Sequence, residues 1–467
     1  MILIKAARLV LEDRNLMTAY TQLKRMGLFD ARVPRYTSYP TAPHFSADVG
    51  VAQSAEWINT LPEGDKISVY VHIPFCRRLC WFCACRTQGT STAAPVAAYL
   101  ETVKAELALL RAQLPQGIEI EHLHWGGGTP TLLTPEMITD LAGAVKNVAP
   151  LADGAQFSVE IDPNEIDDAR MDALAAAGMN RASIGVQDFD PGIQETIGRP
   201  QSYEVTKAAV DGLRARGIQS LNVDILYGLP DQSEEKISQS VQMLLSLNPD
   251  RIALFGYAHV PWMAKRQKMI PTDTLPTPEE RLGLFNTARK LFMWDGYAEI
   301  GIDHFARPGD GLEVAQREGR MQRNFQGYTE DSSQTLIGLG ASSISRYKQG
   351  YAQNHPSTSG YQKAVRAGQF ATKRGHVFTA EDHLRGAVIE ALLCDFSADL
   401  PALAARCGQS TDQALALTTG LEDAFSGMVR VIDGVIKIAT EARPLARIIA
   451  RYFDSYEMSA AGHSHAV

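Results

Sequence analysis

Cysteine is scarce in this chain of 467 residues. Four of the six cysteines fall within ten residues: Cys76, Cys80, Cys83 and Cys85. The two remote ones, Cys394 and Cys407, do not suggest a disulfide framework, and we expect them to be small buried hydrophobes in a reducing compartment. The interest of the cysteines therefore lies in one loop.

Long apolar runs and an excess of positive charge are also missing. No run approaches the length of a membrane span, and charges interrupt residues 1–13 too often for a signal peptide. Lys and Arg number 45 against 53 Asp and Glu, a net charge of −8. We therefore expect a cytoplasmic protein that binds neither membrane nor nucleic acid, and an anionic substrate would need a local cluster of Arg or Lys.

What remains is an ordinary globular composition, 45% hydrophobic and 21% charged, with enough chain to bury a large core. Between residues 67 and 258, β-like apolar runs alternate with helix-like segments. The expected strands cover 67–73, 118–125, 156–161, 180–186, 219–226 and 250–258. The expected helices cover 96–111, 135–148, 167–178, 203–217 and 233–247, with Gly178 and Gly217 at C-caps.

This alternation predicts an α/β fold of parallel βαβ units. Six units are too few for a closed eight-fold barrel and suit a partial, open (β/α)6 barrel of TIM-like type, whose chemistry gathers at the carboxyl ends of the strands. A further helix is expected at 278–294, and strand-like runs at 297–304 and 336–344. We place the barrel domain at residues 56–370, after an N-terminal extension over 1–55.

The pattern changes from about residue 371 to helices interrupted by a hairpin. Asp433-Gly434, between the apolar runs of residues 428–439, is typical of a hairpin turn. We expect residues 371–467 to form a small, mostly helical, winged-helix-like domain. The tail from Ser459 to Val467 is expected to be frayed.

The cysteine loop follows the first strand directly, and thiols so placed suggest a metal. Cys76, Cys80 and Cys83 form a Cys-x3-Cys-x2-Cys motif that could ligate three irons of a [4Fe-4S] cluster and leave the fourth open. Cys85 could instead close a four-thiolate site, with zinc or with a fully ligated cluster. The thiols could also be unliganded.

Polar residues and glycines follow the later strands. Gly126 to Thr129 could let a ligand approach the backbone or could form only a tight turn. Glu160 could pair with a ligand ammonium or hydroxyl or could be a helix N-terminal acid. Arg199 could hold a carboxylate or lie at the surface, and Asp224, an acid inside an apolar strand, needs a polar cavity or a partner.

These motifs, with Phe82 just before the third cysteine, resemble the radical S-adenosylmethionine enzymes. The phrase from Tyr70 to Cys76, the Cys-x-Cys step to Cys85 and the phrase from Arg35 to Ala42 are similar to the oxygen-independent coproporphyrinogen III oxidases, over residues 35–456. The resemblance implies that Cys76, Cys80 and Cys83 hold the cluster, with Cys85 as a neighbour. It also implies that residues 34–43, a linker by composition, reach back over the active site.

The resemblance further implies two S-adenosylmethionine sites and a catalytic group of Tyr70, Glu160 and Asp224. The molecule on the cluster would contact Tyr70, Gly127, Glu160 and Ile344. The second would contact Phe82, Gly128, Thr129, Gln187, Arg199, Asp224 and Ala258. His304 matches a family phrase without an assigned role.

The implied reaction is the oxidative decarboxylation of two propionates of coproporphyrinogen III to the vinyl groups of protoporphyrinogen IX, in anaerobic haem synthesis. We expect a monomer that uses an unidentified electron donor and acceptor. For the anionic substrate we expect some of these arginines to hold carboxylates: Arg35, Arg307, Arg317, Arg320 and Arg323. The alternatives are a haem-binding chaperone on the same scaffold, a haem-opening radical methyltransferase and a zinc-binding interaction module.

Overall fold

A central mixed sheet organises the protein in the computed structural model, which describes residues 20–457 and 463–467. Its twelve strands run in the order β16-β15-β14-β13-β1-β4-β5-β6-β7-β8-β10-β9. The six strands predicted from the alternation are neighbours and all parallel. They are β1 (Lys66–Ile73), β4 (Glu119–Gly127), β5 (Leu151–Ile161), β6 (Arg181–Gln187), β7 (Ser220–Tyr227) and β8 (Arg251–Gly256). The predicted α/β fold with a partial, open barrel is confirmed.

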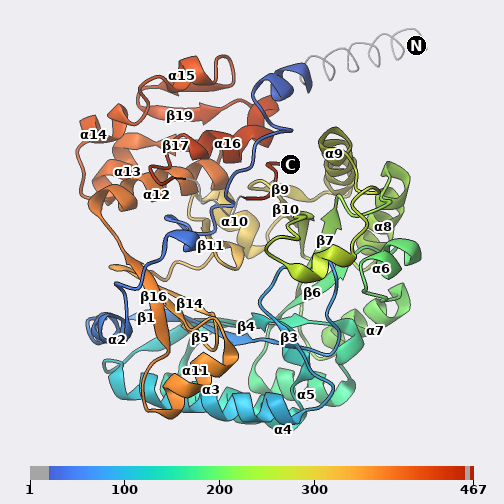
Figure 1. Cartoon of the computed structure of the whole chain (residues 1–467), viewed down its shortest axis with the longest axis vertical. Helices are drawn as coiled ribbons and strands as arrows, with labels where there is room; N and C mark the ends of the chain where they lie inside the picture. The colour runs from blue at the N-terminus through green and yellow to red at the C-terminus, as the bar shows by residue number, and fades with distance from the viewer. Residues whose placement is uncertain (1–19, 458–462) are drawn as a thin grey trace.

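Helices cross over between these strands and form an outer arc around them (Figure 1). They are α3 (Ala94–Gln113), α4 (Pro135–Val148), α5 (Asp168–Ala177), α6 (Pro191–Thr196), α7 (Tyr203–Ala215), α8 (Glu234–Ser246) and α9 (Pro278–Trp294). Their ends follow from local chemistry: the Thr134 hydroxyl caps α4 ahead of Pro135, and Gly178 ends α5 with φ of 97°. Helix α4 buries Ile138, Leu141, Ala142 and Val145, a single stripe against the sheet.

Both edges of the sheet are extended by strands that the βα period does not contain. Beyond β8 lie β10 (His304–Ala306) and β9 (Ala298–Ile300), both antiparallel. Beyond β1 lie β13 (Leu336–Leu339), parallel to β1, and then β14 (Ile344–Tyr347), β15 (Gly350–Asn354) and β16 (Thr372–Val377). Each of the two later strand-like runs is therefore a pair of short strands, with turns at Gly301 and at Gly340 and Ser342, three residues that have positive φ.

The C-terminal unit has a core of its own and begins with α12 (Ala380–Cys394), after β16 has completed the edge of the large sheet. A small antiparallel sheet has the order β17 (Ser397–Asp399), β19 (Val435–Ile438), β18 (Val429–Ile432). Asp433 and Gly434 form the predicted hairpin turn, both with positive φ. The remaining helices are α13 (Leu400–Arg406), α14 (Thr411–Ala416), α15 (Leu421–Ala424) and α16 (Ala446–Arg451).

The N-terminal segment is buried between other parts of the protein. Tyr36 donates to Asp454 (2.9 Å), the Tyr39 and Ser455 hydroxyls are 3.1 Å apart, and Arg35 donates to the carbonyl of Gly256 at the end of β8 (2.8 Å). Figure 1 shows this segment, in blue, running from the C-terminal unit to α2 (Val51–Asn59). The composition-based interpretation as a free linker is thus wrong, because aromatic side chains fix the segment in place.

Some predictions lie outside the described residues. The sequence from Leu16 to Leu28 carries a helical pattern, but the structure describes it only from residue 20. Of the tail that is expected to be frayed, residues 459–462 are not described. In the described part of the chain, no helix combines the length and the apolar character that a membrane crossing requires.

Candidate active site at the carboxyl ends of the strands

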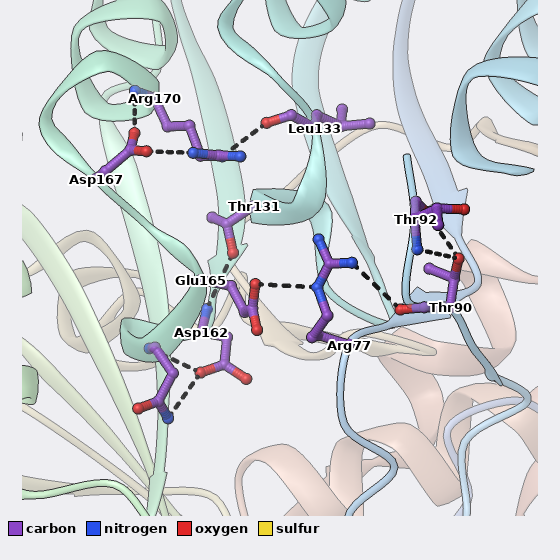
Figure 2. Close-up of polar contacts among 10 residues, drawn as sticks. Arg77, Thr90, Thr92, Thr131, Leu133, Asp162, Glu165, Asp167 and Arg170 are labelled. Atoms are coloured by element: carbon purple, nitrogen blue, oxygen red, sulfur yellow. Dashed lines mark hydrogen bonds and ion pairs between the residues drawn. The ribbon is translucent and has the colours of Figure 1, made fainter. Parts of the chain in front are cut away.

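The cysteine loop leaves β1 and is closed at its base by a two-residue strand pair. β2 (Phe75–Cys76) pairs with β3 (Gln88–Gly89), so residues 77–87 form one loop between the two strands. Figure 2 shows the tie at its start, where Arg77 contacts Glu165 (3.8 Å) and the carbonyl of Thr90 (3.5 Å). All the cysteines of the loop are free thiols; Cys80 is buried and Cys85 is exposed.

Cations lie beside the thiols. Arg199 donates to Cys80 Sγ (3.5 Å) and is paired with Asp162 (3.5 Å). Burial raises the pKa of the Cys80 thiol, whereas hydrogen bonds from Cys85 lower the pKa of Cys83 to about 6. The amide of Cys85 donates to Cys83 Sγ (3.4 Å). Three thiols on one short loop with a guanidinium at hand fit the ligand set of an iron–sulfur cluster.

The glycine loop at the end of β4 packs against the base of the cysteine loop. The amides of Gly128 and Thr129 donate to the carbonyls of Ile73 (2.8 Å) and Phe75 (2.7 Å). A Cβ on Gly128 would lie 2.5 Å from the Phe75 oxygen, and one on Gly127, whose φ is +110°, would lie 2.4 Å from the His72 ring. These two positions therefore require glycine because another part of the chain lies too close for a side chain. The sequence pattern alone could not distinguish this reason from ligand binding.

Glu160 lies at the end of β5 and joins this loop to β4. Its Oε2 accepts from the Gly127 amide (2.9 Å), and its Oε1 lies 3.5 Å from His124 Nε2. Partial burial alone would raise the pKa of Glu160, but His124 and the Gly127 amide outweigh it, and the pKa is lowered. Tyr70, on the same face, stacks on His124 with ring centroids 5.6 Å apart. Glu160 is therefore an ionised acceptor, not a helix cap.

The other residues predicted from the strand ends lie along the same edge. Gln187 ends β6 in a left-handed conformation (φ 72°), and Arg199 donates to the carbonyl of Gly185 in β6 (3.0 Å). Asp224 in β7 accepts from Asn222 (2.8 Å), and burial raises its pKa to about 6. Ile344 begins β14.

One side chain missed by the sequence interpretation connects two predicted residues. The amide of Gln267 donates to the carbonyls of Phe82 (2.6 Å) and Ala258 (3.0 Å), and so joins the cysteine loop to the end of β8. Arg266 next to it donates to Thr87 of the loop. Nothing in the spacing of residues 261–270 indicated this role.

A cavity of about 660 Å³ opens beyond the ends of β7 and β8. Its walls come from the barrel, from the N-terminal segment and from the C-terminal unit, and they include Tyr227, Gly256 and Ala258. Seven arginines of the described chain line it: Arg32, Arg35, Arg281, Arg289, Arg323, Arg443 and Arg447. In a protein of net charge −8, this is the local cationic cluster that an anionic substrate needs.

Only two of the five arginines expected to hold substrate carboxylates line this cavity, Arg35 and Arg323. The other three form surface ion pairs: Arg307 with Asp295 (3.1 Å), Arg317 with Glu313 (2.9 Å) and Arg320 with Glu318 (2.7 Å). These three lie outside the cavity lining, on and around a short helix, α10 (Gly311–Arg317). The prediction that some of the five hold carboxylates therefore rests on Arg35 and Arg323.

The arginines of the cavity differ in how far their charge is already met. Arg289 and Arg443 both contact Glu299, at 2.6 and 3.4 Å. Arg323, 8% exposed, has no hydrogen-bond partner for Nε and Nη1 among the residues the structure describes. Burial lowers the pKa of Arg447 to about 9, and Arg35 beside it contributes. Such unmet positive charge favours an anion.

Residues 464–467 form part of the wall of this cavity. Arg447 donates to the carbonyls of His465 (3.2 Å) and Ala466 (3.2 Å), and Arg281 donates to Val467 (3.1 Å). Val467 is buried, and Figure 1 places this end of the chain between the C-terminal unit and β9 and β10. The described part of the tail is therefore packed, contrary to the expectation that it is frayed.

Comparisons with known proteins identify the family of this chain. Residues 70–244 match the model of the radical SAM superfamily, the class that the barrel and the cysteine loop define. The chain is 59% identical to the oxygen-independent coproporphyrinogen III oxidase of Paracoccus denitrificans over 97% of this chain and 100% of that protein, and 38% identical to that of Escherichia coli over 91% and 93%. The solved E. coli coproporphyrinogen III oxidase has a TM-score of 0.86 at 36% identity, covering 91% of this chain and all of that one. The chain belongs to the oxygen-independent coproporphyrinogen III oxidases.

Proposed function

We propose that this protein converts coproporphyrinogen III to protoporphyrinogen IX by oxidative decarboxylation of two propionates. The observation that carries the proposal is the arginine-lined cavity next to the cysteine loop, in a chain that matches its relatives over nearly their whole length. A propionate β-carbon has no acidic proton, so acid–base side chains alone cannot begin the reaction. Such a reaction needs a site for an anionic substrate next to a site for a cofactor. The cavity and the cysteine loop would provide these two sites.

The cysteine loop would hold the cofactor. Cys76, Cys80 and Cys83 would ligate three irons of a [4Fe-4S] cluster, and the Cys85 amide would stabilise the Cys83 sulfur. When bound, the cluster and S-adenosylmethionine would supply radical chemistry, which can remove a hydrogen atom from the unactivated β-carbon of a propionate. Loss of one electron to an acceptor and of carbon dioxide then leaves a vinyl group.

The remaining residues would bind and orient. Glu160, held by Gly127 and His124, would accept from the ammonium or ribose of the S-adenosylmethionine on the cluster, with Tyr70 and Ile344 beside it. A second molecule would lie among Phe82, Gly128, Thr129, Gln187, Arg199, Asp224 and Ala258. Gln267 joins Phe82 to Ala258, and Ala258 lines the cavity. The arginines would hold propionates and exclude water from the reacting carbon.

Composition supports a cytoplasmic location, and we expect a monomer that relies on a separate electron donor and acceptor. An anaerobic assay tests the proposed reaction directly. Reconstituted protein with S-adenosylmethionine, a reductant and coproporphyrinogen III should give protoporphyrinogen IX, methionine and 5′-deoxyadenosine. Haem binding without decarboxylation would favour a chaperone instead.

The role proposed for Glu160 predicts a loss of cofactor affinity on substitution. Glu160→Gln keeps the shape and an acceptor for the Gly127 amide but removes the charge. We expect the affinity for S-adenosylmethionine to fall by roughly 10- to 100-fold, the usual value of a hydrogen bond to a charged group. Binding is measured by equilibrium dialysis under anaerobic conditions. The control is Glu165→Gln, which removes an acid that pairs with Arg77 at the outer side of the loop; an equal loss there would contradict the role.

Replacing Asp224 with asparagine should have opposite effects on the stability of the protein and on the binding of S-adenosylmethionine. Its pKa of about 6 exceeds the value of an unfolded aspartate, so the folded state binds more protons and stability falls as pH rises from about 4 to 6. Asp224→Asn should therefore raise the melting temperature of the cofactor-free protein by a few degrees at pH 8 and hardly at pH 4, while weakening the second S-adenosylmethionine site. An equal rise at both pH values would show that the buried charge is not the cause.

A further inference from the structure

The arginine-lined cavity contains a carboxylate, Asp303, that its arginines do not saturate. The other described acids of the cavity wall are Glu441, which is exposed, and Glu299, whose oxygens are both held by Arg289 (2.6 and 2.8 Å). Asp303 receives one hydrogen bond, from His304 Nδ1 to Oδ1 (2.7 Å). In the described ranges, 20–457 and 463–467, no hydrogen bond reaches its Oδ2. A carboxylate oxygen that receives no hydrogen bond from the described residues thus lies in the wall of an arginine-lined cavity.

The position of this carboxylate is fixed. The amide of Leu254 in β8 donates to the Asp303 carbonyl (2.8 Å), which holds the backbone at the strand's end. His304 is buried edge-on between the rings of Phe255 and Tyr328, with centroids 5.3 and 5.1 Å away. Burial alone would raise the pKa of Asp303, but His304, Arg323 and Arg35 together lower it. The group is therefore an ionised, oriented acceptor without donors of its own.

A carboxylate at this place would repel the propionates of the substrate unless it made a favourable contact of its own. Coproporphyrinogen carries four carboxylates and also four pyrrole N–H donors. Arginines match the carboxylates, and N–H groups withdrawn from water need an acceptor. The saturated bridges of a porphyrinogen let the ring fold so that its N–H groups converge on one side.

We propose that Asp303 is the acceptor for the pyrrole N–H groups of the tetrapyrrole, and so selects the reduced porphyrinogen over the oxidised porphyrin. The inference rests on the proposed function of the cavity. A porphyrin bears the same propionates, but its flat ring has two N–H groups and two acceptor nitrogens directed at its centre. Only the porphyrinogen can present several donors to a single carboxylate.

The competing explanation is that Asp303 only balances the charge of Arg35 and Arg323. The two explanations differ in what they predict for two ligands of equal charge. Charge balance acts through the propionates, so its removal changes the binding of porphyrinogen and porphyrin by the same factor. An N–H acceptor acts on the porphyrinogen alone.

The test is anaerobic equilibrium binding of coproporphyrinogen III and coproporphyrin III to the wild type and to Asp303→Asn. We expect the wild type to prefer the porphyrinogen, and the variant to lose about tenfold or more in affinity for it while binding the porphyrin equally well or better. Retained porphyrin binding also shows that the variant is folded.

The matched control is Glu299→Gln. It removes the same charge from the same cavity, but Glu299 is held by Arg289 and is not available to accept from the pyrrole N–H groups. It should change the affinity for both ligands alike. The inference is overturned if Asp303→Asn shifts both ligands by one factor or neither, or if the wild type does not discriminate. A wild type that binds neither ligand would overturn the proposed function, and the inference with it.

Discussion

Replacing Cys80 with serine should abolish both the iron–sulfur cluster and turnover, whereas replacing Cys85 with serine should leave a four-iron cluster in place. A serine oxygen is a poor ligand for iron where a thiolate is required. Cys80 lies buried at the heart of the loop beside Arg199, while Cys85 is exposed and contacts Cys83 through its main-chain amide. That amide survives the substitution. The measurement is iron and sulfide content with the electron paramagnetic resonance of the reduced protein.

Cys407→Ser is the control for this pair, since Cys407 is a free thiol in the C-terminal unit, remote from the loop. Its cluster content should match the wild type. Loss of the four-iron cluster in Cys85→Ser would show that four thiolates are needed. The open iron on which S-adenosylmethionine binding depends would then not exist.

The second large effect is expected from the arginines of the cavity. Arg35→Gln and Arg323→Gln should each weaken the binding of coproporphyrinogen III by roughly 10- to 100-fold, because each removes a charged donor for a propionate. Arg323 should show the larger loss, since two of its nitrogens have no partner in the described part of the protein. Steady-state kinetics should place most of the change in KM, the sign of lost binding and not of lost chemistry.

Arg317→Gln and Arg320→Gln are matched controls from the same sequence region. Both side chains form exposed ion pairs, which contribute little to stability or to binding. We expect wild-type KM values from them. A loss equal to that of the cavity variants, or no loss in the cavity variants, would mean that the substrate does not bind where the arginines converge.

Local patterns predicted the barrel well because its units are local. Helix α4 begins at Pro135 and α9 at Pro278, as expected, since each starts with a threonine cap and a proline at its first position. The edges of the sheet could not be predicted in this way. β13 pairs with β1 although more than 260 residues separate them, and nothing in the sequence of either strand indicates this pairing.

The same division holds for the candidate site. The cysteine loop, the glycine loop, Glu160 and Asp224 were predictable because the carboxyl ends of parallel strands meet at one edge. The cavity was not, because its arginines come from the N-terminal segment, α9, the strand region of Arg323 and the C-terminal unit. Proximity in sequence favoured Arg317 and Arg320 instead. Only the fold shows that these two lie outside the cavity and that Arg447 lines it.

The proposed reaction is tested most directly by following the hydrogen atom that is removed from the propionate β-carbon. Coproporphyrinogen III deuterated at the β-carbons of its propionates is incubated anaerobically with the reconstituted protein, S-adenosylmethionine and a reductant, and the 5′-deoxyadenosine is examined by mass spectrometry. The account predicts that deuterium appears in the 5′-deoxyadenosine, in step with vinyl formation. Vinyl products formed with unlabelled 5′-deoxyadenosine would contradict it.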